Sequence, residues 1–157
     1  MSERQVFWTN ELGSGRVVVV SDNPVARALL AIAEAAGREV VHVAEDEGGP
    51  GLPALTAADA VVLCDHDAPD APTLLRAALA SEASYVAMMA SRARAADLVA
   101  ELSEEGVPGL DTLHVPAGLD LGGKTPGEIA LSVASEIQAE RHGRSGGSMR
   151  AKISSTD

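Results

Sequence analysis

Three basic side chains stand out in an otherwise acidic sequence: Arg92, Arg94 and Lys124. Residues 1–140 contain 8 lysines and arginines against 22 aspartates and glutamates, so a cation is uncommon there. Arginine forms paired, charge-assisted hydrogen bonds with phosphate, and lysine binds it as a point charge. These three residues therefore favour an anionic ligand that carries phosphate. The alternative is a loop in which they form salt bridges with the surrounding acids.

The segment around Lys124 also matches a nucleotide-binding pattern. Residues 118–125 read Gly-Leu-Asp-Leu-Gly-Gly-Lys-Thr, which fits Gly-x4-Gly-Lys-Thr. In a P-loop the lysine lies within the first helical turn, whereas Pro126 and Glu128 predict a helix that begins only at Pro126. The acidic strand that would hold a metal ion also lies upstream, at 61–65. Nucleotide hydrolysis is therefore disfavoured, while Gly118 and Lys124 stay candidate contacts for an anion.

The turn formed by residues 21–24 precedes a predicted helix, whose N-terminus attracts anions. A dinucleotide-binding turn would read Gly-x-Gly-x-x-Gly/Ala here, and only Ala26 fits that pattern. Ser21 and Asn23 carry a Cβ where pyrophosphate would approach the backbone. Glu45, in the place of a ribose-binding acid, is one of three acids in a loop. The sequence thus disfavours NAD(P) binding.

A polar cluster, Cys64-Asp65-His66-Asp67, ends another apolar run. It could form a metal site or an acid–base pair. No second group of His and Cys residues at zinc-ligand spacing supports a metal. We favour a small buried cysteine beside a polar strand end, with His66 and Asp67 as ligand contacts.

Alternating strands and helices position these residues. Short β-branched runs predict strands over 16–20, 39–44, 59–64, 84–89 and 113–115. Helical spacing and capping residues predict helices over 24–36, 71–79, 91–105 and 126–140. This order predicts an α/β, Rossmann-like three-layer domain with a mostly parallel sheet of about five strands. Ligands of such sheets bind at the carboxyl ends of the strands, and all the candidate residues follow predicted strands.

Composition excludes several classes of protein. The net charge of −11 argues against nucleic acid or an anionic membrane as partner. The single cysteine fits a reducing compartment, and no apolar run suits a signal peptide or a membrane span, so we predict a cytoplasmic protein.

The sequence divides into three parts. We expect an irregular N-terminal segment over 1–15, one domain over 16–143 and a disordered Gly/Ser-rich tail over 144–157. Phe7 and Trp8 in the first part are expected to cover an edge of the core. The alternative is that they dock on a partner.

Several motifs together resemble one known family. The resemblance is strongest in four C-terminal pieces: 116–122, Thr125-Pro126, 128–132 and 136–137. Weaker similarity appears at 23–29, His66-Asp67, Tyr85 and Ser91-Arg92. Over about residues 16–143 the sequence resembles the C-terminal domain of the XdhC family, the accessory proteins of xanthine dehydrogenase and carbon monoxide dehydrogenase.

The resemblance implies a Rossmann domain that helps molybdenum hydroxylases mature. Members of the family bind the molybdenum cofactor (molybdopterin), promote its sulfuration and pass it to the target enzyme. If the protein binds this cofactor, the candidate binding residues are those at the predicted ligand end of the sheet: Ser21, Asn23, Pro24, His66, Asp67, Ser91, Arg92, Arg94, Gly118 and Lys124. We expect no catalytic or metal-ligating residue and no counterpart of the family's usual N-terminal domain. The family's glycines at 21, 23, 87 and 90 are replaced here by Ser, Asn, Ala and Ala.

The first hypothesis is therefore a non-catalytic accessory protein for molybdenum cofactor insertion. Its partner would be a molybdenum hydroxylase client or another accessory subunit, and pairing of two copies stays open. One alternative is an NAD(P)-binding oxidoreductase. The other is an interaction module of a split XdhC system that binds no ligand.

Overall fold

The computed structural model describes residues 15–44 and 51–150, and within them five strands form one sheet. The strand order is β2–β1–β3–β4–β5, and every neighbouring pair is parallel. The strands are β1 (Arg16–Val20), β2 (Glu39–Val43), β3 (Ala60–Leu63), β4 (Tyr85–Met88) and β5 (Leu113–His114). The predicted Rossmann-like fold is confirmed: β1 has its expected bounds, and each end of the other strands lies within one residue of the expected position.

In residues 15–44 and 51–150, four α-helices connect or follow these strands, and their starts are fixed by capping side chains and prolines. They are α2 (Pro24–Ala35), α3 (Ala71–Ala80), α4 (Arg92–Glu105) and α5 (Pro126–Arg141), with a single-turn 3-10 helix η2 (Leu110–Thr112) before β5. Thr125 Oγ1 accepts from the Glu128 N–H at 3.2 Å, and the Glu128 carboxylate accepts from the Thr125 N–H at 3.2 Å. This is the capping box that the sequence predicts. Within the described ranges, no helix combines the length and the apolar character that a bilayer span requires.

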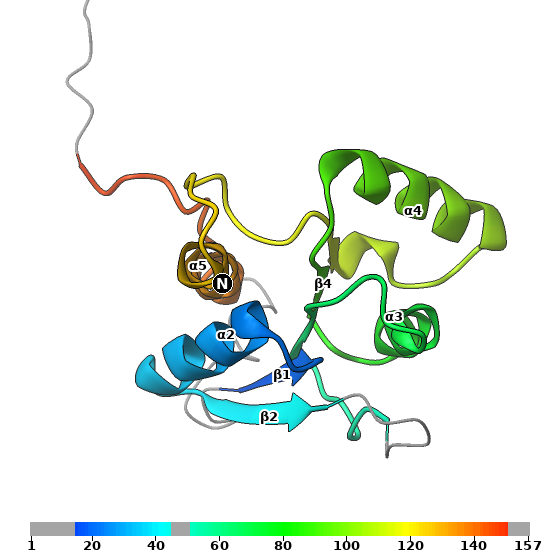
Figure 1. The fold of residues 1–157 in the computed structure, drawn as a ribbon, viewed down its shortest axis with the longest axis horizontal. Coiled ribbons are helices and arrows are strands. Elements are labelled where there is room, and N and C mark those ends of the chain that lie inside the picture. Colours follow the sequence, from blue (N-terminus) through cyan, green and yellow to red (C-terminus); the bar gives the residue numbers. More distant parts are fainter. Residues whose placement is uncertain (1–14, 45–50, 151–157) are drawn as a thin grey trace, which may run out of the picture.

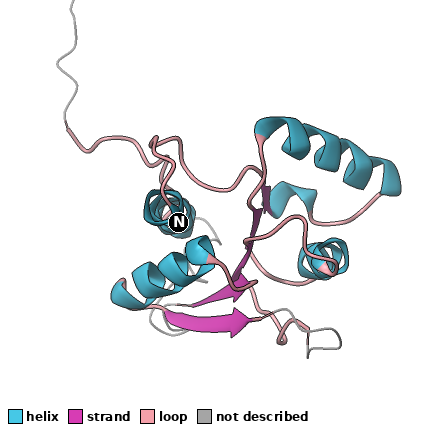
Figure 2. Cartoon of the chain, in the orientation of Figure 1, coloured by secondary structure: helices cyan, strands magenta, loops and turns pink. Residues whose placement is uncertain are grey.

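The helices cover the two faces of the sheet in pairs. Figure 1 shows α2 and α5 on one face and α3 and α4 on the other, and Figure 2 shows the same three layers by type of structure. Alternate residues of β1 face the two helix layers. Val17 and Val19 pack toward α2 and α5, while Val18 and Val20 pack toward α3 and α4. Because both faces are covered, the strands are apolar throughout.

The order of the strands reverses between β1 and β3. From β1 the chain proceeds through α2 to β2 on one side, and from β3 it proceeds through α3, β4 and α4 to β5 on the other. The loops that follow β1 and β3 therefore separate at the carboxyl edge of the sheet. This is where ligands of open parallel sheets bind.

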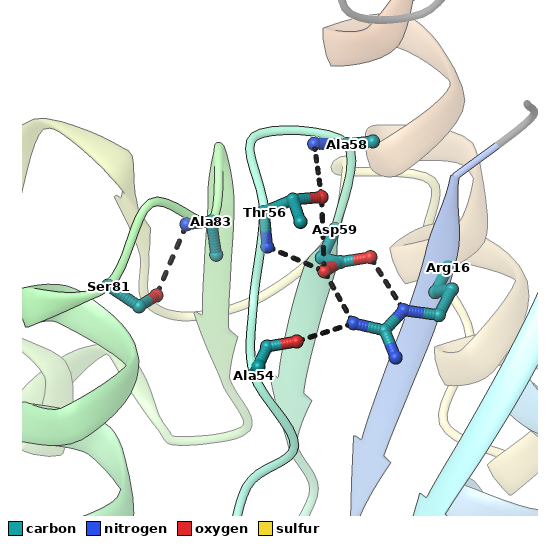
Figure 3. A network of polar contacts seen from close by, with 7 residues as sticks. All are labelled: Arg16, Ala54, Thr56, Ala58, Asp59, Ser81 and Ala83. Atoms are coloured by element: carbon teal, nitrogen blue, oxygen red, sulfur yellow. Dashed lines mark hydrogen bonds and ion pairs between the residues drawn. The ribbon is translucent and has the colours of Figure 1, made fainter. Parts of the chain in front are cut away.

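The opposite, amino edge of the sheet holds an ion pair between the partly exposed Arg16 and the buried Asp59 (Figure 3). Arg16 donates from Nε to Asp59 Oδ1 at 2.9 Å and from Nη2 to Asp59 Oδ2 at 2.7 Å. The Thr56 N–H donates to Asp59 Oδ2 at 2.7 Å, and Arg16 Nη2 donates to the Ala54 carbonyl at 2.7 Å. Asp59 is 2% exposed. The pair ties the start of β1 to the segment that leads into β3.

Candidate functional site

A cavity of about 300 Å³ opens at the carboxyl edge, between α3 and α4. Among the residues that the structure describes, the polar ones that line it are His66, Arg76, Arg94, Asp97 and Glu101. His66 follows β3, and Arg94 lies in the first turn of α4. The cavity therefore lies at the edge where the sequence predicts a ligand site.

His66 and Arg94 line this cavity, and Asp67, which does not line it, contacts both of them. The Arg94 guanidinium forms an ion pair with the Asp67 carboxylate. His66 Nε2 lies 3.4 Å from Asp67 Oδ2, and His66 Nδ1 lies 3.0 Å from the Met89 carbonyl oxygen. A carbonyl only accepts, so Nδ1 donates, and this bond fixes the ring beside the end of β4.

Ser91 belongs to the same group, whereas Arg92 and Lys124 lie outside it. Ser91 Oγ accepts from the Arg94 N–H at 3.2 Å and so caps α4. Arg92 and Lys124 are exposed, and neither lines the cavity. Among the contacts of residues 15–44 and 51–150, neither side chain forms an ion pair. Arg94 is thus the member of the predicted trio of cations that reaches the cavity.

The turn between β1 and α2 is filled by an asparagine side chain. Asn23 Oδ1 accepts from the Ala26 N–H at 2.9 Å, and Asn23 Nδ2 donates to the Cys64 carbonyl at 3.1 Å. Pro24, the first residue of α2, has no N–H to offer. The amide therefore caps the N-terminus of α2 and links the ends of β1 and β3.

Ser21, at the start of the same turn, has a φ of +89°, the only positive value among the non-glycine residues in the described part of the chain. Its N–H donates to the Val43 carbonyl at 2.9 Å, and its carbonyl oxygen lies 2.7 Å from His42 Nε2. A left-handed backbone is strained for a residue with a Cβ. These contacts from β2 hold it there.

We predict that Ser21→Gly is more stable than Ser21→Ala by about 1 kcal/mol, because glycine removes the Cβ strain while both variants lose the hydroxyl. Urea unfolding of the two variants measures the difference. Equal midpoints and slopes would show that the turn is not strained.

A buried polar network fixes the loop that follows β5. Glu136 on α5 accepts at Oε1 from the Tyr85 hydroxyl at 2.6 Å and from the Gly118 N–H at 3.1 Å, and His114 Nδ1 lies 3.4 Å from the same oxygen. The Tyr85 and His114 rings stack with centroids 4.5 Å apart. Burial raises the pKa of Glu136, but the bonds from His114, Tyr85 and Gly118 outweigh it, and the net pKa lies below its ordinary value. Glu136 is therefore a carboxylate that holds the loop.

The residues that resemble a P-loop have other roles. The Gly118 N–H is bonded to Glu136, and a Cβ at Gly118 would lie 2.5 Å from Ser132 Oγ. Thr125 caps α5, which begins only at Pro126. Gly118 is thus packed against α5 and does not line the cavity. This arrangement opposes phosphate binding in the manner of a P-loop.

Cys64 is buried, with 6% of its surface exposed, and burial raises the pKa of its thiol to about 12. The thiol is therefore protonated at neutral pH, which matches a small apolar packing residue. Within the part of the chain that the structure describes, no three His, Cys, Asp or Glu side chains gather as a metal site would require.

The sequence analysis missed two acidic residues that line the cavity, Asp97 and Glu101. Arg94, Asp97 and Glu101 are spaced by three and four residues, which places them on one face of α4. The same spacing was visible in the sequence. Arg76 on α3 also lines the cavity, and its guanidinium forms ion pairs with Glu105 and Glu101 of α4.

The sequence matches the XdhC Rossmann domain family over residues 17–137. The chain belongs to this family. All the candidate residues fall inside the matched range, and the resemblance proposed from the sequence motifs is confirmed.

Individual relatives agree with this assignment. A crystal structure of a xanthine dehydrogenase from Bacillus halodurans superimposes with a TM-score of 0.68 at 19% identity, covering 86% of this chain and 45% of that one. At this identity the likeness shows the shared fold. YqeB of Escherichia coli K12, an uncharacterized protein, is 35% identical over 68 residues, which are 42% of this chain and 13% of YqeB. This XdhC-type chain spans less than half the length of the Bacillus protein.

Proposed function

We propose that the protein is an XdhC-type accessory factor that holds the molybdenum cofactor as cargo for a molybdenum hydroxylase. The observation that supports the proposal is that Arg94 and His66 line a cavity on the carboxyl edge of an XdhC Rossmann domain. The cofactor's pterin carries a terminal phosphate, for which Arg94 is the cationic donor, while Asp97 and Glu101 on the same lining would keep the phosphate at the Arg94 end of the cavity. The molybdenum chemistry itself would take place in the client enzyme.

Arg94 is the proposed phosphate ligand. Its ion pair with Asp67 is exposed, with 56% and 71% of the two side chains accessible. Exposed pairs contribute only about 0–1 kcal/mol, so displacing Asp67 costs little. A phosphate, which carries more charge than a carboxylate, can therefore compete with Asp67 as the partner of Arg94. Arg92 and Lys124, which are exposed, would add longer-range attraction.

The cavity sets the orientation of the ligand. Small-molecule sites usually measure about 300–1,000 Å³, so this one is at the lower limit. We propose that it receives the phosphate-bearing end of the pterin, with His66 in hydrogen-bonding reach and the remainder outside. The partner that accepts the cargo, a client enzyme or another accessory subunit, would meet the same edge.

The test is equilibrium dialysis of the purified chain against molybdopterin under anaerobic conditions. We expect Arg94→Ala to weaken binding about tenfold, the equivalent of about 1.4 kcal/mol. Arg92→Ala/Lys124→Ala should weaken it less and mainly at low salt. Arg150→Ala, which removes an exposed arginine from the tail, is the control for total charge.

Two outcomes would contradict the proposal. Absence of binding by the unaltered chain would leave the family's interaction module as the remaining function. Equal losses in Arg94→Ala and Arg150→Ala would show that the attraction is not located at this cavity.

A further inference from the structure

A second, larger cavity lies in the other helix layer. The helices α2 and α5 lie side by side on one face of the sheet (Figure 1), and a cavity of about 700 Å³ opens between them. Small-molecule sites usually measure about 300–1,000 Å³, so this volume is well within their range. Val17 of β1 lines it, and most of its other described lining residues are apolar, among them Ile32, Leu131 and Ala134. We call it the α2/α5 cavity.

The segment that follows α5 forms a further wall of this cavity. Gly143 has a φ of +63°, and the chain turns back there, so that the Arg144 N–H donates to the Ala139 carbonyl at 2.8 Å. Gly146 then packs against the loop that follows β5, where a Cβ at Gly146 would lie 2.7 Å from Leu119 Cδ1. Arg144, Gly146 and Leu119 all line the cavity. Two helices, the sheet and this returning segment therefore enclose it on several sides.

The apolar and the basic lining residues lie toward different ends. Leu131 is in the second turn of α5, and the Leu119 N–H donates to the Ser132 carbonyl at 3.1 Å, so both leucines lie at the N-terminal end of that helix. His142 and Arg144 follow the last residue of α5. The helical rise from Leu131 to His142 amounts to roughly 16 Å. The lining therefore suits an elongated molecule with an apolar body and a polar end group.

The sign of that end group follows from the charges around the cavity. Its described lining contains Arg38, His142 and Arg144 but no aspartate or glutamate, in a chain whose net charge is −11. Arg38 donates to the Gln138 side chain and is not part of the proposed contact. Arg144 is exposed, and no acid in the described part of the chain forms an ion pair with it. Its guanidinium can therefore form charge-assisted hydrogen bonds with a terminal anion.

We propose that the α2/α5 cavity binds an amphipathic organic anion of the acyl carboxylate class. The acyl chain would lie between α2 and α5 against Ile32, Leu131 and Ala134, and its carboxylate would accept from the Arg144 guanidinium, with His142 at the same end. This inference is independent of the proposed cofactor site, which lies in the opposite helix layer. Arg94→Ala should therefore leave acyl carboxylate binding unchanged.

The test is displacement of the fluorescent apolar anion anilinonaphthalene sulfonate from the intact chain. We expect the native protein to enhance the emission of this probe and shift it to the blue. Decanoate should displace the probe at concentrations below those at which it forms micelles. Decyltrimethylammonium, which has the same alkyl chain and the opposite charge, should displace it about tenfold more weakly because it lacks an acceptor for Arg144.

Two pairs of variants locate the site. Leu131→Glu places a carboxylate at a 51% exposed position of the lining and should weaken decanoate binding about tenfold or more. Val99→Glu is its matched control, because Val99 is a 39% exposed apolar residue of α4 that lines neither described cavity. Arg144→Gln should weaken decanoate binding about fivefold, whereas Arg150→Gln, which removes an exposed arginine of the tail, should leave it unchanged.

Circular dichroism and urea unfolding of each variant verify that the domain stays folded. Absence of decanoate-displaceable probe binding by the unaltered chain would overturn the proposal. So would equal losses in Leu131→Glu and Val99→Glu, or equal displacement by the anion and the cation. Binding that is confined to dilute, monomeric protein would overturn it too, because a second copy of the chain would then be the occupant; light scattering gives the oligomeric state.

Discussion

Replacing Asp59 with asparagine should lower the free energy of unfolding by about 2 kcal/mol, because it removes the buried, charged acceptor of Arg16 and Thr56, while Arg16 itself is 26% exposed and keeps contact with water. Asp59 is 2% exposed and accepts from two donors of Arg16 and from Thr56. Urea unfolding at pH 7 measures the loss. Asp120→Asn, at an exposed loop position, is the control and should change stability by less than about 0.5 kcal/mol.

The same variant has a predicted pH dependence. Burial raises the pKa of Asp59, but the bonds from Arg16 and Thr56 outweigh it and hold the pKa below its ordinary value of 3.8. Its contribution to stability is therefore complete above the ordinary value and is lost as pH falls through the lower, folded value. Between pH 7 and pH 3 the stability of the unaltered chain should fall more steeply than that of Asp59→Asn. Parallel curves would show that the ion pair does not contribute.

Replacing Glu136 with alanine should cost about 2–3 kcal/mol, because it removes the acceptor of a buried tyrosine hydroxyl and of a loop N–H. Tyr85 is 1% exposed, so water cannot replace the lost partner without entering the core. Thermal and urea unfolding measure the change. Glu104→Ala, at an exposed position of α4, is the matched control.

A double variant separates the energy of the Tyr85–Glu136 hydrogen bond from the other contacts that Glu136→Ala removes. Tyr85→Phe removes the stranded hydroxyl, so Tyr85→Phe/Glu136→Ala should be more stable than the sum of the single losses predicts. The coupling should amount to about 1 kcal/mol or more. If the losses simply add, the hydrogen bond of 2.6 Å has no energetic role beyond that of its neighbours.

The fold could be predicted from local sequence signals because those signals agree with each other. Val17–Val20 is an uninterrupted β-branched run, and Thr125, Pro126 and Glu128 specify the start of α5 within a single turn. Such features depend on neighbours in the chain, and the structure reproduces them to within one residue. The family assignment relied on the same segments.

The residues of the candidate site could be predicted only in part from local sequence signals. Arg92 and Arg94 were grouped because both follow β4, yet residues two apart on a helix project to different sides. Arg94 lines the cavity and Arg92 does not. The Tyr85–Glu136 contact joins residues 51 positions apart, and the cavity that Arg94 lines exists only once α3 and α4 lie next to each other. No local pattern contains that information.

The amide of Asn23 sets a condition on any ligand that would displace it from the turn between β1 and α2. It satisfies one donor, the Ala26 N–H, and one acceptor, the Cys64 carbonyl, at the same time. A bare phosphate could replace it at the N–H but would leave the carbonyl oxygen facing a second negative group. A ligand that replaces the amide without leaving either group unpaired must therefore both donate and accept a hydrogen bond.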